Sequence, residues 1–167
     1  MKAQRPIGVL FVCLGNICRS PIAEGAFLQA AAAAGVAARF RVDSAGVSDF
    51  HEGDPPDSRA VAAAAARGFD ISRQVCRPVR PADFTAFDYI LAMDQANLAA
   101  LARLRPATAT AWTALVLEAA EGRHEEVQDP YTGTAQDFEV VVDKLQRASR
   151  ELVWRLLAGH GSAARRS

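Results

Sequence analysis

Residues 7–21 read IGVLFVCLGNICRSP. The first part, 7–12, is a continuous apolar run rich in branched side chains, which is typical of a strand buried on both faces within a parallel sheet. A short polar segment, 13–19, follows it. Ser20-Pro21 then favours the start of a helix, because proline fits the first helical position. The order strand, loop, helix predicts a βα unit with the loop at the carboxyl end of its strand.

The rest of the chain continues this alternation. Apolar patterning predicts further strands at 40–44 and 88–93 and a weaker one at 107–113. It predicts helices at 59–67, from Asp94 onward, and over a long amphipathic segment beginning near Phe138. Stretches with several glycines and prolines, 48–58 and 118–134, are expected to be loops. Strands that alternate with helices indicate the α/β class with a parallel sheet.

The composition places this chain among single-domain globular proteins. It has 167 residues, half of them apolar and 23% charged, and we expect one domain over 1–158 with a disordered tail over 159–167. The net charge of zero argues against a general nucleic-acid binder. No apolar stretch approaches the roughly 20 residues that cross a membrane, so no membrane partner is expected. Frequent alanine and arginine suggest a GC-rich bacterial genome.

The cysteines indicate the compartment. Three of them, Cys13, Cys18 and Cys76, cannot all pair, and without a signal peptide an odd number is typical of a reducing cytoplasm. Cys-x4-Cys lacks the second pair of a zinc site. The histidines are scattered without the spacing of metal ligands, at His51, His124 and His160. We therefore expect neither a metal nor a cofactor.

The loop after the first strand has the form Cys-x5-Arg-Ser, from Cys13 to Ser20. Its backbone N–H groups can curl into an anion-binding nest, to which the helix N-terminus adds its own free N–H groups. Arg19 supplies a planar fork for two phosphate oxygens. Because these positive potentials converge on Cys13, they favour its thiolate form, which is a nucleophile at phosphorus. Ser20 can donate a hydrogen bond to that sulfur. The alternative is that Cys13 is a small core residue.

A phosphate ester also needs an acid for its leaving oxygen. Asp129 precedes Pro130 in the polar segment 118–134, and proline pushes the residue before it towards an extended geometry. Such a carboxylate, held on a rim, could act as general acid. The alternative is an ordinary turn aspartate before proline.

Taken together, four segments resemble the low-molecular-weight protein tyrosine phosphatase family. FVCLGNICRSPIAEG (11–25) resembles its phosphate loop and following helix, and QDPYTG (128–133) resembles its general-acid loop. DSAGVSDF (43–50) and FDYILAMDQANL (87–98) resemble its second conserved segment and its third strand with the helix start. The similarity covers the chain from about residue 7 to residue 157.

The resemblance implies a fold and a chemistry. The fold is a four-stranded parallel sheet with helices on both faces, a flavodoxin-like three-layer sandwich. The chemistry is metal-free hydrolysis of phosphotyrosine in a protein substrate, through a phosphocysteine, with inorganic phosphate as product. Separately, we expect the chain to be a monomer.

The resemblance also assigns roles. Cys13 is the nucleophile, Arg19 the phosphate ligand and Asp129 the acid and then the base. The phosphate loop is completed by Leu14, Gly15, Asn16, Ile17, Cys18 and Ser20. Asn16, Ser20 and Ser44 brace that loop. Leu14, Phe50 and Tyr131 grip an aromatic ring, with Asp94 near the mouth.

Two positions carry further expectations. Gln74 falls where members often have a histidine that steadies the loop asparagine; glutamine can hydrogen bond but cannot carry charge. Cys18 is expected to form a reversible disulfide with an oxidised Cys13, or else to pack under the loop.

Three rival functions remain open. A thiol-coupled arsenate reductase would need two further cysteines after the third strand, and only Cys76, before that strand, is present. Arginine-directed phosphatases tend to have threonine where this chain has Ile17, whose methyl groups suit a flat ring better. A non-catalytic phosphate-binding module would need neither a thiolate nor an acid.

Overall fold

A four-stranded parallel sheet forms the centre of the chain, with strand order β2-β1-β3-β4. In the computed structural model, residues 5–166 are described, with side chains described over 5–159. The strands are β1 (Ile7–Cys13), β2 (Phe40–Gly46), β3 (Tyr89–Ala92) and β4 (Trp112–Leu115). This confirms the predicted α/β fold with four parallel strands.

Strand β1 lies in the middle of the sheet and every one of its residues is buried. Its alternate side chains enter two separate cores: Phe11 and Cys13 pack into one, and Leu10 and Val12 into the other. A strand with no polar face must be apolar throughout, which explains the continuous run that begins at Ile7.

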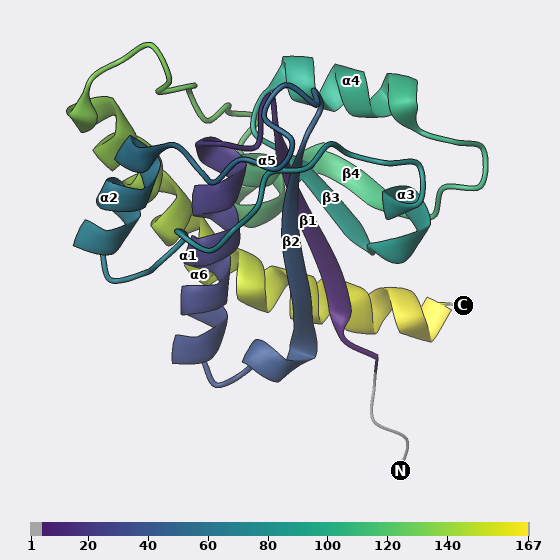
Figure 1. Cartoon of the computed structure of the whole chain (residues 1–167). Helices are drawn as coiled ribbons and strands as arrows, with labels where there is room; N and C mark the ends of the chain where they lie inside the picture. Colours follow the sequence, from purple (N-terminus) through teal and green to yellow (C-terminus); the bar gives the residue numbers. More distant parts are fainter. Residues whose placement is uncertain (1–4, 167) are drawn as a thin grey trace.

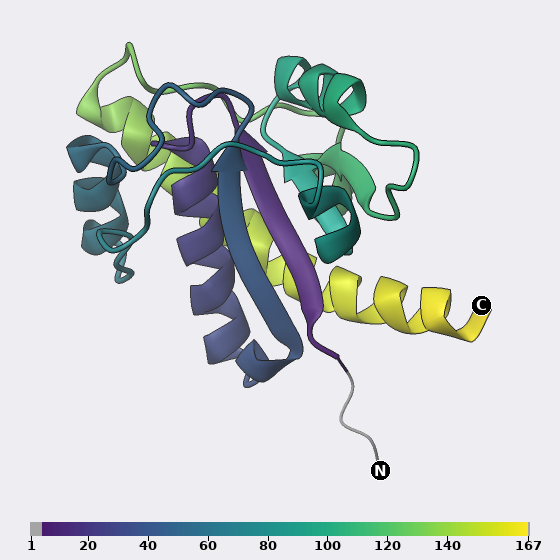
Figure 2. The same ribbon diagram turned by 45° about the vertical axis from the view of Figure 1, so that its right-hand side comes forward.

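Helices cover both faces of the sheet (Figures 1 and 2). One face carries α1 (Arg19–Ala33), α5 (Val116–Glu121) and α6 (Ala135–Arg166), with α2 (Ser58–Ala66) packed against α1 and α6. The other face carries α3 (Asp83–Ala86) and α4 (Gln95–Leu104). A short 3₁₀ turn, Ala37–Arg39, precedes β2. Among residues 5–166, none of the helices combines the length and apolarity that a membrane crossing requires.

The strand order locates the functional end of the sheet. From β1 the chain moves outward to β2 on one side, and then returns to place β3 on the other side of β1. The strand order therefore reverses between β1 and β3, and ligands of open α/β sheets bind at the carboxyl ends of the strands at such a point. The loop that follows β1 opens there.

Several predicted boundaries were wrong. The fourth strand begins at Trp112 rather than over 107–113, because its pairing with β3, Tyr89 opposite Trp112, sets the register. The first part of the predicted loop 118–134 is helical, since α5 continues to Glu121 and ends at Gly122 in the left-handed conformation.

The ends of the first and last helices also differ from expectation. Helix α1 begins at Arg19, before Ser20-Pro21, and its first turn tolerates proline because N–H groups there have no helical partner. The structure continues α6 to Arg166, where a disordered tail from residue 159 was expected; residue 167 lies outside the described residues.

Candidate active site

The loop from Cys13 to Arg19 joins the end of β1 to the start of α1 and curls beneath a cavity. Asn16 has φ of 59°, a left-handed conformation that asparagine tolerates better than most residues. Cys18, at the N-cap of α1, makes no side-chain capping bond. The N–H groups of the first helical turn therefore have no side-chain acceptor, which suits them to bind an anion.

Hydrogen bonds connect the buried polar side chains of this loop. Cys13 Sγ lies 3.0 Å from Ser20 Oγ. Asn16 Nδ2 donates both to Ser20 Oγ at 2.9 Å and to Ser44 Oγ at 3.0 Å. Three of the residues predicted to brace the loop thus meet beside Cys13. Ser44 comes from β2, so the network also fastens the loop to the neighbouring strand.

Asn16 is held from its other side by the segment after Gln74. The backbone N–H of Arg77 donates to Asn16 Oδ1 at 3.0 Å, and the Cys76 thiol donates to the Asn16 carbonyl at 2.8 Å. Burial raises the pKa of Cys76 to about 11, which keeps it a neutral donor. The Arg77 guanidinium is fixed between Asp43 and Asp83. Sequence reasoning assigned no role to Arg77 or Cys76.

Gly46, the last residue of β2, lets the loop approach the sheet. A Cβ atom at Gly46 would lie 2.9 Å from the Leu14 carbonyl oxygen and 3.1 Å from the Asn16 backbone nitrogen. Both neighbours are backbone atoms of the phosphate loop, which cannot rotate away as a side chain can. Only glycine fits here without moving the loop.

Arg19 is buried and its orientation is fixed by three oxygen atoms. Its Nη1 donates to Asp94 Oδ2 at 2.7 Å and to the Val127 carbonyl at 3.0 Å, and its Nη2 lies 3.5 Å from Asp129 Oδ2. Asp94 also caps α4, where its Oδ1 accepts from the Asn97 N–H at 2.8 Å. Asp94, which was expected near the mouth of the pocket, thus contacts the guanidinium of Arg19 directly.

Asp129 lies on an anchored loop. The Val127 N–H donates to the Met93 carbonyl just after β3, and Asp129 Oδ1 accepts from the Tyr131 N–H at 3.1 Å. The Asp129 side chain is 44% exposed, so its carboxyl group reaches both the cavity and solvent.

The cavity above the loop has a volume of about 360 Å³. Its walls contain the predicted residues Leu14, Phe50 and Tyr131, together with Ile17. These three predicted residues are about half or more exposed, from 49% for Tyr131 to 83% for Phe50, so the cavity has an open apolar rim. The cavity is also lined by residues of the loop after β1 and by the carboxyl group expected to act as the acid: Cys13, Gly15, Cys18, Arg19 and Asp129.

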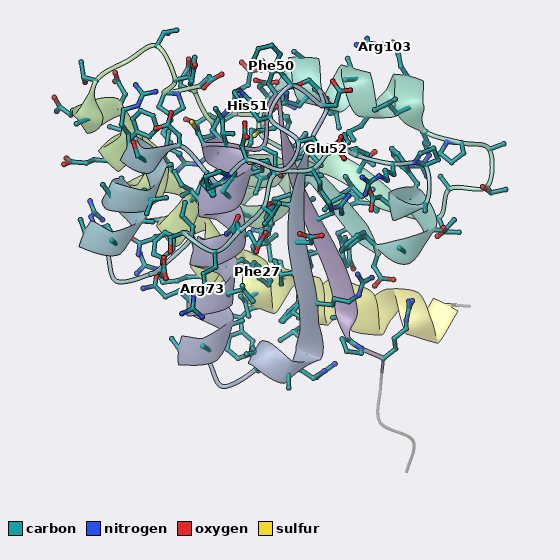
Figure 3. The ribbon with its side chains drawn as sticks, viewed as in Figure 1. Phe27, Phe50, His51, Glu52, Arg73 and Arg103 are labelled. Carbon is teal, nitrogen blue, oxygen red and sulfur yellow. The ribbon has the colours of Figure 1, made fainter. Side chains whose placement is uncertain are left out.

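Ser48 and His51 also line this cavity, and sequence reasoning did not place them there. Figure 3 shows His51 beside Phe50, above the carboxyl ends of the strands. His51 packs on the phosphate loop, because a Cβ atom at Gly15 would lie 3.1 Å from its ring. Its Nδ1 is 3.4 Å from Asp54 Oδ2.

Gln74 contacts Ser44, one of the side chains that hydrogen bond to Asn16 beneath the loop. Its Nε2 donates to the Pro21 carbonyl at 3.0 Å, which turns its Oε1 towards Ser44 Oγ at 3.5 Å. The Ser44 hydroxyl donates to Glu24 Oε1 at 2.8 Å. Burial raises the pKa of Glu24 to about 7. Sequence reasoning missed Glu24, although its spacing of four residues from Ser20 puts both on one face of α1.

Cys18 is buried beneath the loop, and its pKa is raised above the ordinary value for a thiol, chiefly by that burial. Over the part of the chain that the structure describes, no cluster of three or more His, Cys, Asp or Glu side chains has the arrangement of a metal site. The cavity brings together a thiol, a guanidinium, a carboxyl group and the loop that joins β1 to α1.

Sequence comparisons match this chain to one family of phosphatases. A family model described as low molecular weight phosphotyrosine protein phosphatase matches residues 8–160. The human protein of that name is 39% identical over 152 residues, which cover 90% of this chain and 96% of that protein. The Schizosaccharomyces pombe protein is 42% identical over 134 residues, covering 79% and 85%.

Solved structures agree with the sequence relatives. A protein tyrosine phosphatase from Entamoeba histolytica has a TM-score of 0.86 and 35% identity, covering 92% of this chain and 99% of that one. The arginine phosphatase YwlE, from Bacillus subtilis, has a TM-score of 0.79 and 28% identity, covering 90% and 95%. The same fold thus serves at least two kinds of phosphatase.

Proposed function

Since this chain belongs to the low-molecular-weight phosphotyrosine protein phosphatase family, we propose that it hydrolyses phosphotyrosine in proteins through a phosphocysteine on Cys13. One observation carries the proposal: Cys13, Arg19 and Asp129 line one cavity, and the guanidinium of Arg19 lies 3.5 Å from the carboxylate of Asp129. Binding alone would need neither the sulfur nor the acid.

In the first step the phosphate group of the substrate binds in the loop. Backbone N–H groups and Arg19 hold its oxygens and offset the charge that develops on them. The Cys13 thiolate attacks phosphorus, a P–S bond forms, and the bond from phosphorus to the tyrosine oxygen breaks. Asp129, protonated at this stage, gives its proton to that oxygen, so that tyrosine leaves as a neutral phenol.

In the second step water releases the phosphate. The Asp129 carboxylate takes a proton from a water molecule, whose oxygen attacks phosphorus as the P–S bond breaks. Inorganic phosphate leaves, and the thiolate of Cys13 is restored. The Ser20 hydroxyl, 3.0 Å from the sulfur, donates to the departing thiolate and so stabilises it as a leaving group.

The lining of the cavity favours phosphotyrosine as the substrate. Leu14, Ile17, Phe50 and Tyr131 surround the space above the loop, and aromatic contacts with a bound ring contribute about 0.5–1.5 kcal/mol each beyond area burial. Ile17 offers no hydroxyl group to a guanidinium. We therefore propose a preference for phosphotyrosine over phosphoarginine, phosphoserine and phosphothreonine.

The thiols suggest a cytoplasmic location and a redox response. All three cysteines are free, as a reducing compartment keeps them. Hydrogen peroxide would convert the Cys13 thiolate to a sulfenic acid. The Cys18 thiol would then form an S–S bond with it and release water, and a reducing thiol would restore both residues.

Two assays test the proposed activity. Hydrolysis of para-nitrophenyl phosphate in the presence of a metal chelator is expected, and its absence would contradict a metal-free phosphatase. Comparison of kcat/KM on matched phosphotyrosine and phosphoarginine peptides tests the substrate class. Ile17→Thr is expected to shift the ratio towards phosphoarginine; a wild-type preference for phosphoarginine would overturn the assignment.

A further inference from the structure

A continuous chain of hydrogen bonds, buried except for its part-buried last step, leads from the nucleophile to a carboxyl group that the proposed chemistry does not use. From Cys13 Sγ it passes through Ser20, Asn16 and Ser44 to Glu24, with every step between 2.8 and 3.0 Å. Three of its members, Ser20, Asn16 and Ser44, are buried side chains. Helix α1 therefore contributes both Ser20, at the sulfur, and Glu24, at the far end.

The contacts fix the direction of most donors in this chain. Asn16 Oδ1 accepts from the Arg77 N–H, so the Asn16 amide must donate both of its protons, one to each serine oxygen. Each serine hydroxyl then directs its own proton elsewhere. That of Ser20 can go to Cys13 Sγ at 3.0 Å or to the Ala45 carbonyl at 3.4 Å, and that of Ser44 goes to Glu24 Oε1 or to Gln74 Oε1.

The charge of Glu24 selects between two arrangements. When Glu24 is ionised, it accepts the Ser44 proton; the Ser44 oxygen becomes a stronger acceptor and draws the Asn16 amide away from Ser20, because hydrogen bonds in a chain polarise one another. When Glu24 is protonated, it donates to Ser44 Oγ, and the Ser44 proton turns to Gln74 Oε1. Ser44 then competes less strongly for Asn16.

We propose, on the basis of the proposed function, that Glu24 is a positioning residue: its protonation strengthens the support that Asn16 and Ser20 give to Cys13, and its ionisation weakens that support. The negative charge itself acts in the same direction, because a carboxylate close to the loop repels both the thiolate and a bound anion. Both effects predict weaker anion binding when Glu24 is ionised.

The surroundings of Glu24 allow its charge to change near neutral pH. Gln74, from the segment packed on α1, is uncharged, and Asp43 on β2 opposes ionisation. Arg77 favours ionisation but is shared between Asp43 and Asp83. Burial, the largest influence, raises the pKa of Glu24 to about 7.

The first test compares Glu24→Gln with wild type over a range of pH. The ratio of their kcat/KM values cancels the titration of the substrate and of every group that they share. The kcat/KM of Glu24→Gln divided by that of wild type is expected to rise by about fivefold as the pH increases, with a midpoint near pH 7. Fivefold is the lower end of typical coupling between sites. Glu151→Gln, on the exposed side of α6, is the matched control. A ratio that is independent of pH would overturn the proposal.

The second test uses the wild-type protein and needs neither turnover nor a variant. The Glu24 carboxyl group is titrated by ¹³C NMR with and without saturating sulfate, which keeps its charge over this range. Because coupling is reciprocal, bound sulfate is expected to raise the pKa of Glu24. An unchanged pKa with sulfate bound would overturn the role of Glu24 alone. Failure of sulfate to bind would overturn the phosphate site and the proposal with it.

Discussion

Replacing Glu24 by glutamine is expected to change how the stability of the fold depends on pH. Burial raises the pKa of Glu24 from 4.5 to about 7 in the folded chain. Below pH 4.5 the carboxyl group is protonated in both the folded and the unfolded chain, so it contributes no difference. Between pH 4.5 and 7 only the unfolded chain ionises, so the free energy of unfolding falls as pH rises; above pH 7 the loss is complete.

The size of this loss follows from the pKa. At about 1.4 kcal/mol for each pKa unit, the rise corresponds to about 2–3 kcal/mol of unfolding free energy once partial solvation of the group is allowed for. Glu24→Gln lacks this titration, so its stability relative to wild type should increase by that amount between pH 4.5 and 7.5.

Urea denaturation at a series of pH values measures the free energy of unfolding of each protein. Subtracting the wild-type value from that of Glu24→Gln cancels the titration of every group that the two proteins share. The control Glu151→Gln, which removes an exposed carboxyl group, should show no such change. A difference between Glu24→Gln and wild type that is the same at every pH would refute the reasoning, because it would mean that Glu24 ionises in the folded chain as freely as in the unfolded one.

Three further substitutions test other parts of the site. Asp129→Asn should slow hydrolysis by roughly 10²–10⁴-fold for poor leaving groups and by less for para-nitrophenyl phosphate; an equal loss on phenyl phosphate and para-nitrophenyl phosphate would show that Asp129 is not the acid. Cys18→Ser should recover less activity than wild type when a thiol is added after peroxide treatment, since Cys13 would have no partner to protect it from further oxidation; equal recovery would exclude the protective role. Gly46→Ala places a methyl group 2.9 Å from the Leu14 carbonyl, so it should cost roughly 1–3 kcal/mol of stability and weaken phosphate binding. The control Gly159→Ala, whose nearest contact would be 3.8 Å away, should do neither. Phosphate binding by Gly46→Ala as tight as that of wild type would contradict the close fit.

The sequence predicted the parts of the site that are local along the chain. The apolar run before Cys13 and the helix after Arg19 define a loop at the end of a buried strand, and the strand–loop–helix order alone places it at the ligand-binding edge. Asp129 needed the family resemblance, because an aspartate before proline is common in turns. The structure adds the contact that relates the two segments, between Arg19 and Asp129.

The support beneath the loop could not be predicted in the same way. Asn16 meets Ser44, Cys76 and Arg77, residues that lie far along the chain. They come together only when β2 pairs with β1 and the segment around Arg77 pairs with Gly46 at the end of β2. Arg77 resembles any surface arginine in the sequence, and its ion pairs with Asp43 and Asp83 exist only in the folded chain.

The errors in secondary structure have a similar origin. Residues 107–111 have mixed propensities, and in the folded chain the N–H groups of Thr110 and Ala111 both donate to the Phe84 carbonyl, which holds this segment against α3. The strand begins only where β3 offers a partner, at Trp112. Helix α5 was missed because it is short and Gly122, which ends it, also marks loops.

The central claim is that Cys13 carries the phosphoryl group during turnover. The most direct measurement is mass spectrometry of protein quenched in acid within milliseconds of mixing with a phosphotyrosine peptide, followed by digestion. We predict a phosphoryl group on the peptide that contains Cys13, absent in Cys13→Ser, which should bind vanadate but not turn over. Hydrolysis by pure Cys13→Ser, or rapid turnover of the wild type with no phosphoryl group on Cys13 at any time, would contradict the account.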